Sequence, residues 1–217
     1  MPAIFRPSAN LAAAVTLLAV VGICMVAVAW WWLWPRTDYA RHVRWPLRQP
    51  VPFSHEHHVA GLGLDCRFCH SSVEVSANAG LPPTSTCMTC HSQIWTNAEL
   101  LEPVRLSLAH DTPITWQRVN DLPDYVYFNH SIHIAKGVGC SSCHGDVDRM
   151  PLTYKAKSLT MGFCLECHRN PGPRLRPKDQ IFNAQWHRTA GTPTPEALMH
   201  AYHIGGRRLT DCSICHR

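Results

Sequence analysis

Ten of the eleven cysteines in this 217-residue chain lie in five copies of one short pattern, Cys-x-x-Cys-His. This pattern is typical of c-type haem attachment, and it constrains the fold more than any other feature of the sequence. In each copy the two thiols form thioethers to the vinyl groups of one haem, and the histidine becomes the proximal ligand of its iron. The copies are Cys66, Cys69 and His70; Cys87, Cys90 and His91; Cys140, Cys143 and His144; Cys164, Cys167 and His168; and Cys212, Cys215 and His216.

Zinc knuckles and disulfides are the two other uses of paired cysteines. Zinc sites need a second pair and no fixed histidine after the second cysteine. Disulfide bonding leaves the residue after each pair free to vary. All five copies end in histidine, and no further Cys-x-x-Cys is present. The sequence therefore predicts five haem c groups. None of the five has lysine in place of the histidine, which would have indicated an open catalytic iron.

An internal repeat organises the chain after residue 52. Residues 53–70 and 128–144 both begin with phenylalanine, continue as His-x-x-His, and reach a haem motif through glycine. The two copies lie about 75 residues apart, and so do the haem motifs that follow each of them. This period predicts a first dihaem unit over 53–127, a second over 128–198, and a C-terminal haem segment over 199–217.

The His-x-x-His pairs of the repeat are candidates for the distal ligands. Histidines at i and i+3 of a helical turn point to nearly the same side, so each can reach an iron if two haems pack against the turn. This arrangement resembles class III multihaem cytochromes, in which such a pair supplies the sixth ligands of two different haems. By that resemblance, the distal ligands are His55, His58, His130 and His133.

The fifth distal ligand has several candidates. Residues 200–216 again read His-x-x-His followed by glycine and a haem motif, and His203 aligns with the second histidine of the other pairs. The alternatives are His200, Met150 and Met161. Ligation by methionine would raise the reduction potential of that haem above the value for two histidines.

Residues 11–34 carry no charge and are long enough to span a bilayer. Four tryptophans gather at the far end, as expected at a membrane interface, and Pro35 follows. The run exceeds the 7 to 15 residues usual in a cleaved signal peptide, which favours a permanent anchor. Cys24 is expected to be a plain apolar residue within it.

The anchor divides the chain into a cytoplasmic N-terminus over 1–10, the membrane span, and a linker over 35–52. Arginines are more frequent after the span than before it, so the positive-inside rule alone would place the haem domain in the cytoplasm. Haem is attached to c-type cytochromes outside the cytoplasmic membrane, and that chemistry decides the orientation. We therefore expect the N-terminus inside and residues 36–217 on the periplasmic or outer side.

The outer part offers roughly 36 residues per haem motif, too few to build an apolar core around each one. We expect a mostly irregular fold with short α-helices, no substantial sheet, and haem motifs on short helices: a class III-like multihaem cytochrome c domain on one transmembrane helix. Seventeen prolines support the shortness of the helices. The net charge of +5 is spread along the chain, so nucleic acid is not an expected partner.

Fully ligated irons have no open position for a substrate, so such a chain is expected to transfer electrons rather than act as an enzyme. Beside a membrane anchor, this suggests electrons taken from a quinol and handed on outside. The chain resembles the pentahaem subunit of Alternative complex III, a quinol:electron-acceptor oxidoreductase, over most of residues 50–217. The motifs that carry the resemblance are Phe53 to Val59, Gly63 to His70, Pro82 to Gln93, Leu122 to His133, and Cys212 to Arg217.

The resemblance implies three kinds of partner: an iron–sulfur/molybdopterin-like subunit, a monohaem cytochrome c, and multi-helix membrane subunits that oxidise the quinol. The alternative is a self-sufficient, membrane-anchored multihaem quinol dehydrogenase that feeds a periplasmic reductase. In that class the first haem lies close behind the anchor. Here 31 residues separate Trp34 from Cys66, which favours the complex subunit.

Overall fold

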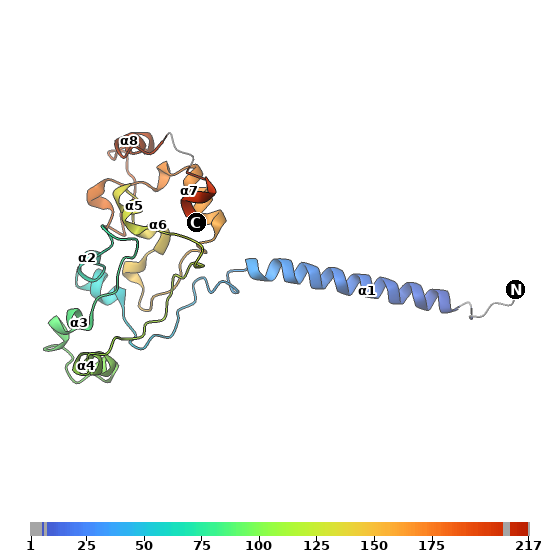
Figure 1. The fold of residues 1–217 in the computed structure, drawn as a ribbon, viewed down its shortest axis with the longest axis horizontal. Helices are drawn as coiled ribbons and strands as arrows, with labels where there is room; N and C mark the ends of the chain where they lie inside the picture. Colours follow the sequence, from blue (N-terminus) through green and yellow to red (C-terminus); the bar gives the residue numbers. More distant parts are fainter. Residues whose placement is uncertain (1–5, 7, 206–208, 217) are drawn as a thin grey trace. The chain divides into compact units, whose positions relative to one another are not determined.

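The computed structural model describes residues 6, 8–205 and 209–216. It divides into two compact units, Met1–Val43 and Arg44–Arg217 (Figure 1). The expected cytoplasmic segment, residues 1–10, lies mostly outside the described residues.

The first unit is dominated by helix α1 (Ser8–Leu33), which begins three residues before the predicted span and ends one residue before its predicted end. A short 3-10 turn, η1 (Trp34–Arg36), follows and contains Pro35. The rings of Trp30 and Trp34 stack with their centroids 5.0 Å apart. Among the described residues, this is the one helix long and apolar enough to cross a membrane, and a cleaved signal sequence would have the same properties.

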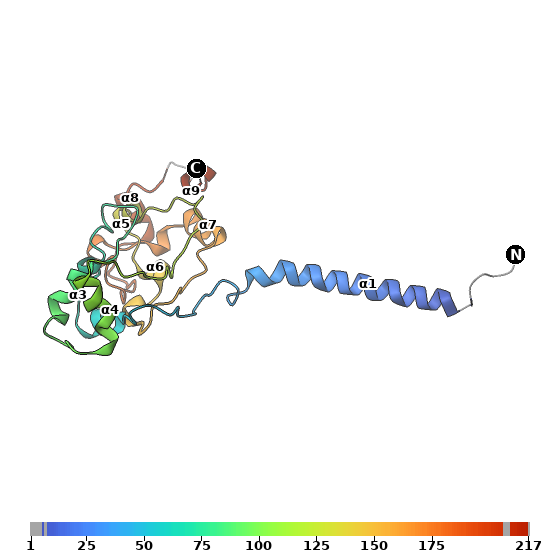
Figure 2. The ribbon, with the colours of Figure 1, turned by 60° about the horizontal axis from the view of Figure 1, so that its bottom comes forward.

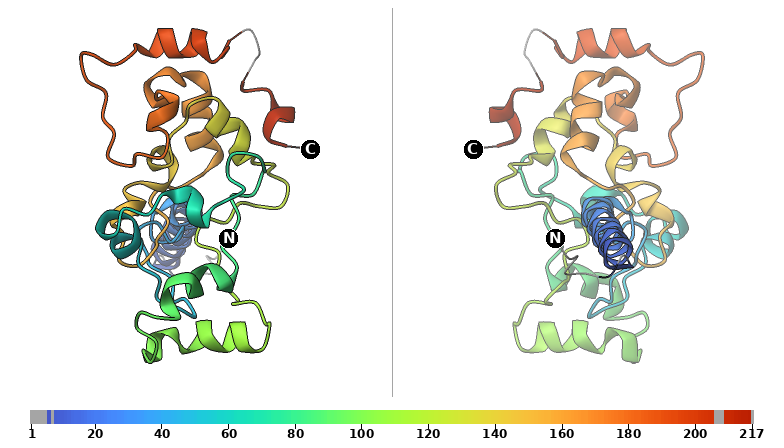
Figure 3. Two further views of the ribbon diagram at one scale, coloured as in Figure 1. Left: turned by 90° about the vertical axis from the view of Figure 1, so that its left-hand side faces the viewer. Right: turned by 90° about the vertical axis from the view of Figure 1, so that its right-hand side faces the viewer.

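The second unit consists of short helices joined by irregular segments. The α-helices are α2 (Cys66–Cys69), α3 (Thr84–His91), α4 (Glu102–Ala109), α5 (His130–Ala135), α6 (Ser141–His144), α7 (Met161–Arg169), α8 (Pro195–Ala201) and α9 (Cys212–Cys215). A π-helical turn, η2 (Glu56–Gly61), and the 3-10 turns η3 (Glu99–Leu101), η4 (Val147–Arg149), η5 (Gly172–Arg174) and η6 (Lys178–Gln180) complete the set. Within this unit, α3 and α4 lie at one end and α8 at the other (Figures 2 and 3).

No β-strand occurs in the described part of the chain, which confirms the expected helical and irregular fold. Three isolated β-bridges join distant segments: Pro46 with Tyr154, Val126 with His216, and Val138 with Leu175. These backbone bridges connect segments of the unit that are far apart in the sequence, although in the described residues they do not extend into a sheet.

Two small apolar clusters replace a single large core. One contains the buried side chains of Val51, Leu101 and Val104, and the other those of Val73, Ile134 and Ile181. Each cluster draws its members from segments far apart in the sequence. Their small size agrees with the expectation that apolar side chains alone provide little of this fold's interior.

Backbone hydrogen bonds connect the two copies of the internal repeat. The N–H groups of His130 and Ser131 donate to the carbonyls of Ala77 and Ser76, at 3.2 and 3.1 Å. These bonds attach the start of α5 to the loop that follows the first haem motif. The second copy is therefore built directly against the first.

Candidate haem-binding sites

Each Cys-x-x-Cys-His motif lies on or at the end of a short helix, as predicted. In three motifs the backbone N–H of the histidine donates to the carbonyl of the first cysteine, at 2.9 Å for His70, 2.9 Å for His144 and 2.8 Å for His216. A bond between residues four apart closes one α-helical turn. The two thiols and the imidazole therefore come from a single turn, as a group held by two sulfurs and one nitrogen requires.

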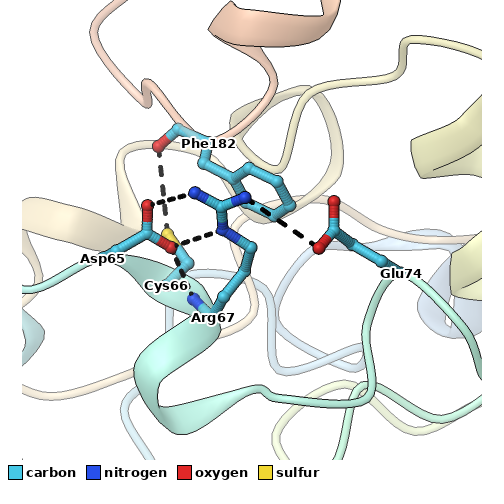
Figure 4. A network of polar contacts seen from close by, with 5 residues as sticks. All are labelled: Asp65, Cys66, Arg67, Glu74 and Phe182. Carbon is cyan, nitrogen blue, oxygen red and sulfur yellow. Dashed lines mark hydrogen bonds and ion pairs between the residues drawn. The ribbon is translucent and has the colours of Figure 1, made fainter.

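Polar contacts hold the start of the first motif helix in place (Figure 4). Asp65 caps α2 by accepting from the backbone N–H of Arg67 at 2.8 Å, and it also accepts two bonds from the guanidinium of Arg67, each of 2.9 Å. The hydrogen bond from the Arg67 side chain lowers the pKa of Asp65. The guanidinium lies 4.5 Å from the ring centroid of Phe182, whose carbonyl is 3.9 Å from the Cys66 sulfur. Because both charged groups are about half exposed, solvent screens their attraction, and the pair serves mainly to orient α2.

The repeat seen in the sequence is also a repeat of geometry. In the first copy, the ring of Phe53 lies edge-on to His55 (centroids 5.0 Å apart, planes at 88°) and stacks on His58 (4.4 Å, 25°). In the second copy, the ring of Phe128 lies edge-on to His130 (4.8 Å, 89°) and stacks on the following histidine, His133 (4.5 Å, 27°). Each phenylalanine therefore fixes the orientation of both imidazoles of its pair.

The structure brings three of these imidazoles opposite the histidine of a haem motif. The ring centroids are 6.1 Å apart for His58 and His91, 6.4 Å for His130 and His144, and 6.2 Å for His133 and His168. Two imidazoles bound through nitrogen to opposite sides of one metal, with bonds of about 2.0–2.1 Å, have their centroids about 6 Å apart. The observed spacing fits two axial ligands of one iron.

His55 is the remaining member of the predicted distal set, and its neighbours include the histidine of the first motif. Burial, followed by the charges of His70, His58 and His144 in that order, lowers the pKa of His55 to about 4. Burial also lowers the pKa of His144 to about 4, and it lowers the pKa of His133. These rings are therefore neutral at pH 7, which is the form that binds a metal.

Each of the five motif histidines and of the histidines in the two His-x-x-His pairs has its Nδ1 atom within hydrogen-bonding distance of a polar group. A ligating histidine usually donates its second ring N–H in this way, because the bond sets the tautomer and the ring orientation. Backbone carbonyls lie within bonding distance of seven rings: Gly80 for His70, Ile94 for His91, Leu209 for His168, Tyr125 for His216, Ser54 for His58, Ala77 for His130 and Asn129 for His133, at 2.7–3.2 Å. Donation from Nδ1 leaves the Nε2 lone pair available for iron in each case.

Two side chains that the sequence analysis missed supply the remaining Nδ1 partners. The hydroxyl of Thr153 lies 2.9 Å from His55 Nδ1, and Asn120 Nδ2 lies 3.2 Å from His144 Nδ1. The Oδ1 atom of Asn120 is buried without a hydrogen-bond partner. Exchanging the two ends of this amide satisfies Oδ1 and makes it the acceptor that an Nε2-ligating His144 needs. Neither residue belongs to a recognisable motif, so no signal in the sequence indicates its role.

Interactions between cysteines show which motifs are neighbours. The thiols of Cys66 and Cys140 interact, which lowers the pKa of Cys66 and raises that of Cys140. Charge interactions link Cys69 with Cys87, Cys143 with Cys167, and Cys164 with Cys215. The motifs therefore follow one another in space in the order second, first, third, fourth and fifth. The second and fifth motifs stand at the ends of this series.

The candidates for the fifth distal ligand are placed differently from the other four. The ring against His216 is that of Tyr125, with centroids 5.8 Å apart. His203 lies just after α8 on exposed backbone with φ of 52°, and among the described residues it makes no ring contact or hydrogen bond with His216. His200 is exposed in α8, Met161 is exposed at the start of α7, and Met150 is buried. The structure does not bring any of these four against the His216 ring.

Five single-turn motifs, imidazoles in opposed pairs and ordered Nδ1 partners fit covalently bound haem, and they define the class as multihaem c-type cytochrome. No protein-family model matches the chain. The chain is 31% identical over 171 residues to the menaquinone reductase multihaem cytochrome c subunit of Nitratidesulfovibrio vulgaris strain Hildenborough, covering 69% of this chain and 79% of the relative. The protein belongs to this family of multihaem cytochrome c subunits, and this membership implies covalently bound c-type haems.

Proposed function

We propose that this chain is the electron-transfer subunit of a membrane-bound quinone oxidoreductase and carries five covalently bound c-type haems. The observation that carries the proposal is the set of opposed imidazoles, in which motif histidines face histidines of the two His-x-x-His segments at about 6 Å. The relative supports the assignment to a quinone-linked complex, because it is a subunit of a menaquinone reductase.

The ring pairs indicate which distal histidine serves which motif. We assign His55 to the haem of His70, His58 to that of His91, His130 to that of His144, and His133 to that of His168. Each His-x-x-His segment then serves two different haems, as the resemblance to class III cytochromes suggested. The ten motif cysteines form the thioethers.

The chemistry of these sites is outer-sphere electron transfer. Haem supplies one-electron redox chemistry. The chain's residues hold the imidazoles neutral by burial, orient them through Nδ1 hydrogen bonds, and fill both axial positions. With both positions filled, no substrate can bind iron at these four sites, so no enzymatic site of the chain's own is expected.

The spatial order of the motifs defines a path for electrons. Neighbouring motifs follow the order second, first, third, fourth and fifth, so electrons would enter and leave at the motifs of His91 and His216. Partner subunits would dock beside these two ends.

We place the haem domain on the periplasmic or outer side of the cytoplasmic membrane, with α1 as a permanent anchor and the N-terminus inside. The complex we favour is of the Alternative complex III type. Its partners would be an iron–sulfur/molybdopterin-like subunit, a monohaem cytochrome c, and multi-helix membrane subunits that carry out the quinol chemistry. In that complex electrons run from quinol to an external acceptor, in a respiratory or photosynthetic chain.

A second candidate is the same subunit working in the opposite direction. The name of the relative, a menaquinone reductase subunit, favours electrons that enter from outside and reach a membrane quinone. The sign of the driving force decides the direction of flow, because the free energy depends only on the difference in potential between donor and acceptor. Both candidates share the same haem sites.

The test is to isolate the native complex in mild detergent and then the chain alone. We expect five covalent haems per chain by mass, an uncleaved N-terminus, and co-purifying membrane and cofactor-bearing subunits. The isolated chain should show no quinol oxidation. Robust quinol oxidation by the isolated chain would instead support the self-sufficient dehydrogenase. Assaying the complex with a quinol, and separately with a quinone and a reduced cytochrome, decides the direction.

Adjacent histidines provide a matched test of the ligand assignment. His58→Ala should convert one haem from low spin to high spin, whereas His57→Ala should leave every haem low spin, because His57 is exposed and its ring stacks on Trp95. Equal spectra for the two variants would contradict the assignment. For the fifth haem, we propose His203 as the distal ligand. His203→Ala should make one haem high spin, and an unchanged spectrum would point to Met150, Met161 or His200.

A further inference from the structure

Arg176 is a buried arginine beside the third haem motif. Its residue is 7% exposed, and its backbone is fixed on both sides: the N–H donates to Gly137 at 2.8 Å, and the carbonyl accepts from the Tyr202 hydroxyl at 2.8 Å. The backbone that carries this side chain is therefore held in place by the fold. The side chain is positively charged, because arginine stays protonated in proteins.

The guanidinium of Arg176 has only neutral partners. It donates to the carbonyl of Asn183 at 2.7 Å and to the hydroxyl of Ser141, and it lies 5.4 Å from the ring centroid of Trp186. Among the described residues, no carboxylate forms an ion pair with it. The buried carboxylate of Asp148 is instead bonded to Gln185, at 2.9 and 3.2 Å. Burial lowers the pKa of Arg176, as expected for a desolvated charge.

Contacts place this charge against the haem motif itself. Ser141, which accepts from the guanidinium, lies inside the Cys140–Cys143 loop, and the charge of Arg176 acts on Cys140. A Cβ atom added at Gly139 would come within 2.4 Å of the Arg176 Nε atom. The absence of a side chain at position 139 is what allows the guanidinium to lie so close to the motif.

We propose that Arg176 acts through its charge to raise the reduction potential of the haem at Cys140, Cys143 and His144. This inference rests on the proposed function, which assigns a haem to that motif. The oxidised iron carries one more positive charge than the reduced iron, so a nearby fixed cation disfavours the oxidised form. An uncompensated charge in a buried environment is screened far less than a surface charge.

A second arginine, Arg67, lies beside the first cysteine of a haem motif and offers a matched control. Arg67 follows Cys66, but its guanidinium is half exposed and is neutralised by the bidentate pair with Asp65. Removing its charge should therefore change the potential of the adjacent haem little.

The experiment is a redox titration of the purified complex, followed by visible and EPR spectra, for Arg176→Gln, Arg176→Lys and Arg67→Gln. One elementary charge at about 12 Å with an effective dielectric constant near 20 changes an equilibrium constant about tenfold. We expect Arg176→Gln to lower one macroscopic potential by about 59 mV, which is the one-electron equivalent of a tenfold change in the equilibrium constant. In Arg176→Lys and in Arg67→Gln, the redox equilibrium constant of each haem should stay within about threefold of its value in the parent. EPR identifies the affected haem, because the nearly parallel planes of His130 and His144 (8°) give a signal unlike that of His58 and His91 (63°).

Two outcomes overturn the inference: unchanged potentials in an Arg176→Gln variant with its full haem content, or equal shifts in the Gln and Lys variants. If Arg176→Gln loses a haem, Ser141→Asp decides, because it leaves the guanidinium in place and gives it a carboxylate partner. With Ser141→Asn as the uncharged control, the same potential should fall in the Asp variant only, and no fall overturns the inference. A parent chain with fewer than five haems would contradict the proposed function instead.

Discussion

Replacing Thr153 with valine tests whether the hydroxyl on His55 tunes the haem of the first motif. The hydroxyl is 2.9 Å from His55 Nδ1, and valine keeps the shape of the side chain while removing the acceptor. A neutral hydrogen bond of this kind contributes about 0.5–1.5 kcal/mol. Losing it makes the imidazole a weaker electron donor and so destabilises the oxidised iron. If the whole bond energy distinguishes the two oxidation states, the potential rises by about 20–60 mV.

The assay is a spectroelectrochemical titration of the complex, with haem content measured by mass in every sample. Thr153→Ser is the matched control, because it retains the hydroxyl and should leave the potential unchanged. One potential should rise in the valine variant while the other four move much less. A valine variant with five haems and potentials within about 10 mV of the parent would refute the reasoning, as would an equal rise in the serine variant.

Three further predictions concern the packing and protonation of the same unit. Gly137→Ala should lower the free energy of unfolding by about 1–3 kcal/mol more than Gly63→Ala, as measured by denaturant titration. Both glycines have a positive φ, but only a Cβ at position 137 would meet the Tyr202 ring, at 2.3 Å. Asn120→Ala should raise the potential of one haem by less than about 60 mV, since His144 loses its Nδ1 partner; no change would contradict the amide assignment. His55 and His144 gain protons below about pH 6.5 in the unfolded chain but only near pH 4 in the folded chain. The contribution of these two groups to the free energy of unfolding should therefore be fully present above pH 6.5 and be lost as the pH falls towards 4, as measured by denaturant titration at several pH values; stability that rises over this range would contradict the lowered pKa values.

The sequence predicted the fold class because its determinants are local. A Cys-x-x-Cys-His motif occupies one helical turn whatever surrounds it, and frequent prolines keep helices short. Such local patterns predicted the helical and irregular architecture, in which the described residues form no strand, and the one apolar N-terminal helix. Contacts between distant segments lie beyond this reasoning. Gln49 bonds to Gln117, and Val51 belongs to an apolar cluster, because contacts with distant segments do not follow from composition.

The candidate site divides in the same way. Repeat spacing identified the histidines of the two His-x-x-His segments, and the resemblance to class III cytochromes predicted that each pair would serve two haems. The repeat spacing did not indicate which motif each histidine faces, and it left His203 as the fifth candidate by alignment alone. In the structure the ring beside His216 is that of Tyr125, and the described residues show no ring contact between His203 and His216. Alignment compares positions along the chain, whereas ligation depends on where two segments meet in space.

The sequence by itself determined the type and number of candidate haem motifs, the histidines most suited to oppose them, and the apolar segment, since each depends on residues within a few positions of one another. Only the tertiary structure decided the pairing of the imidazoles, the spatial order of the motifs, and the polar groups around them. Thr153, Asn120 and Arg176 lie 98, 24 and 35 residues from the groups they bond to. Such partners are brought together by the packing of irregular segments, and no local rule of sequence encodes that packing.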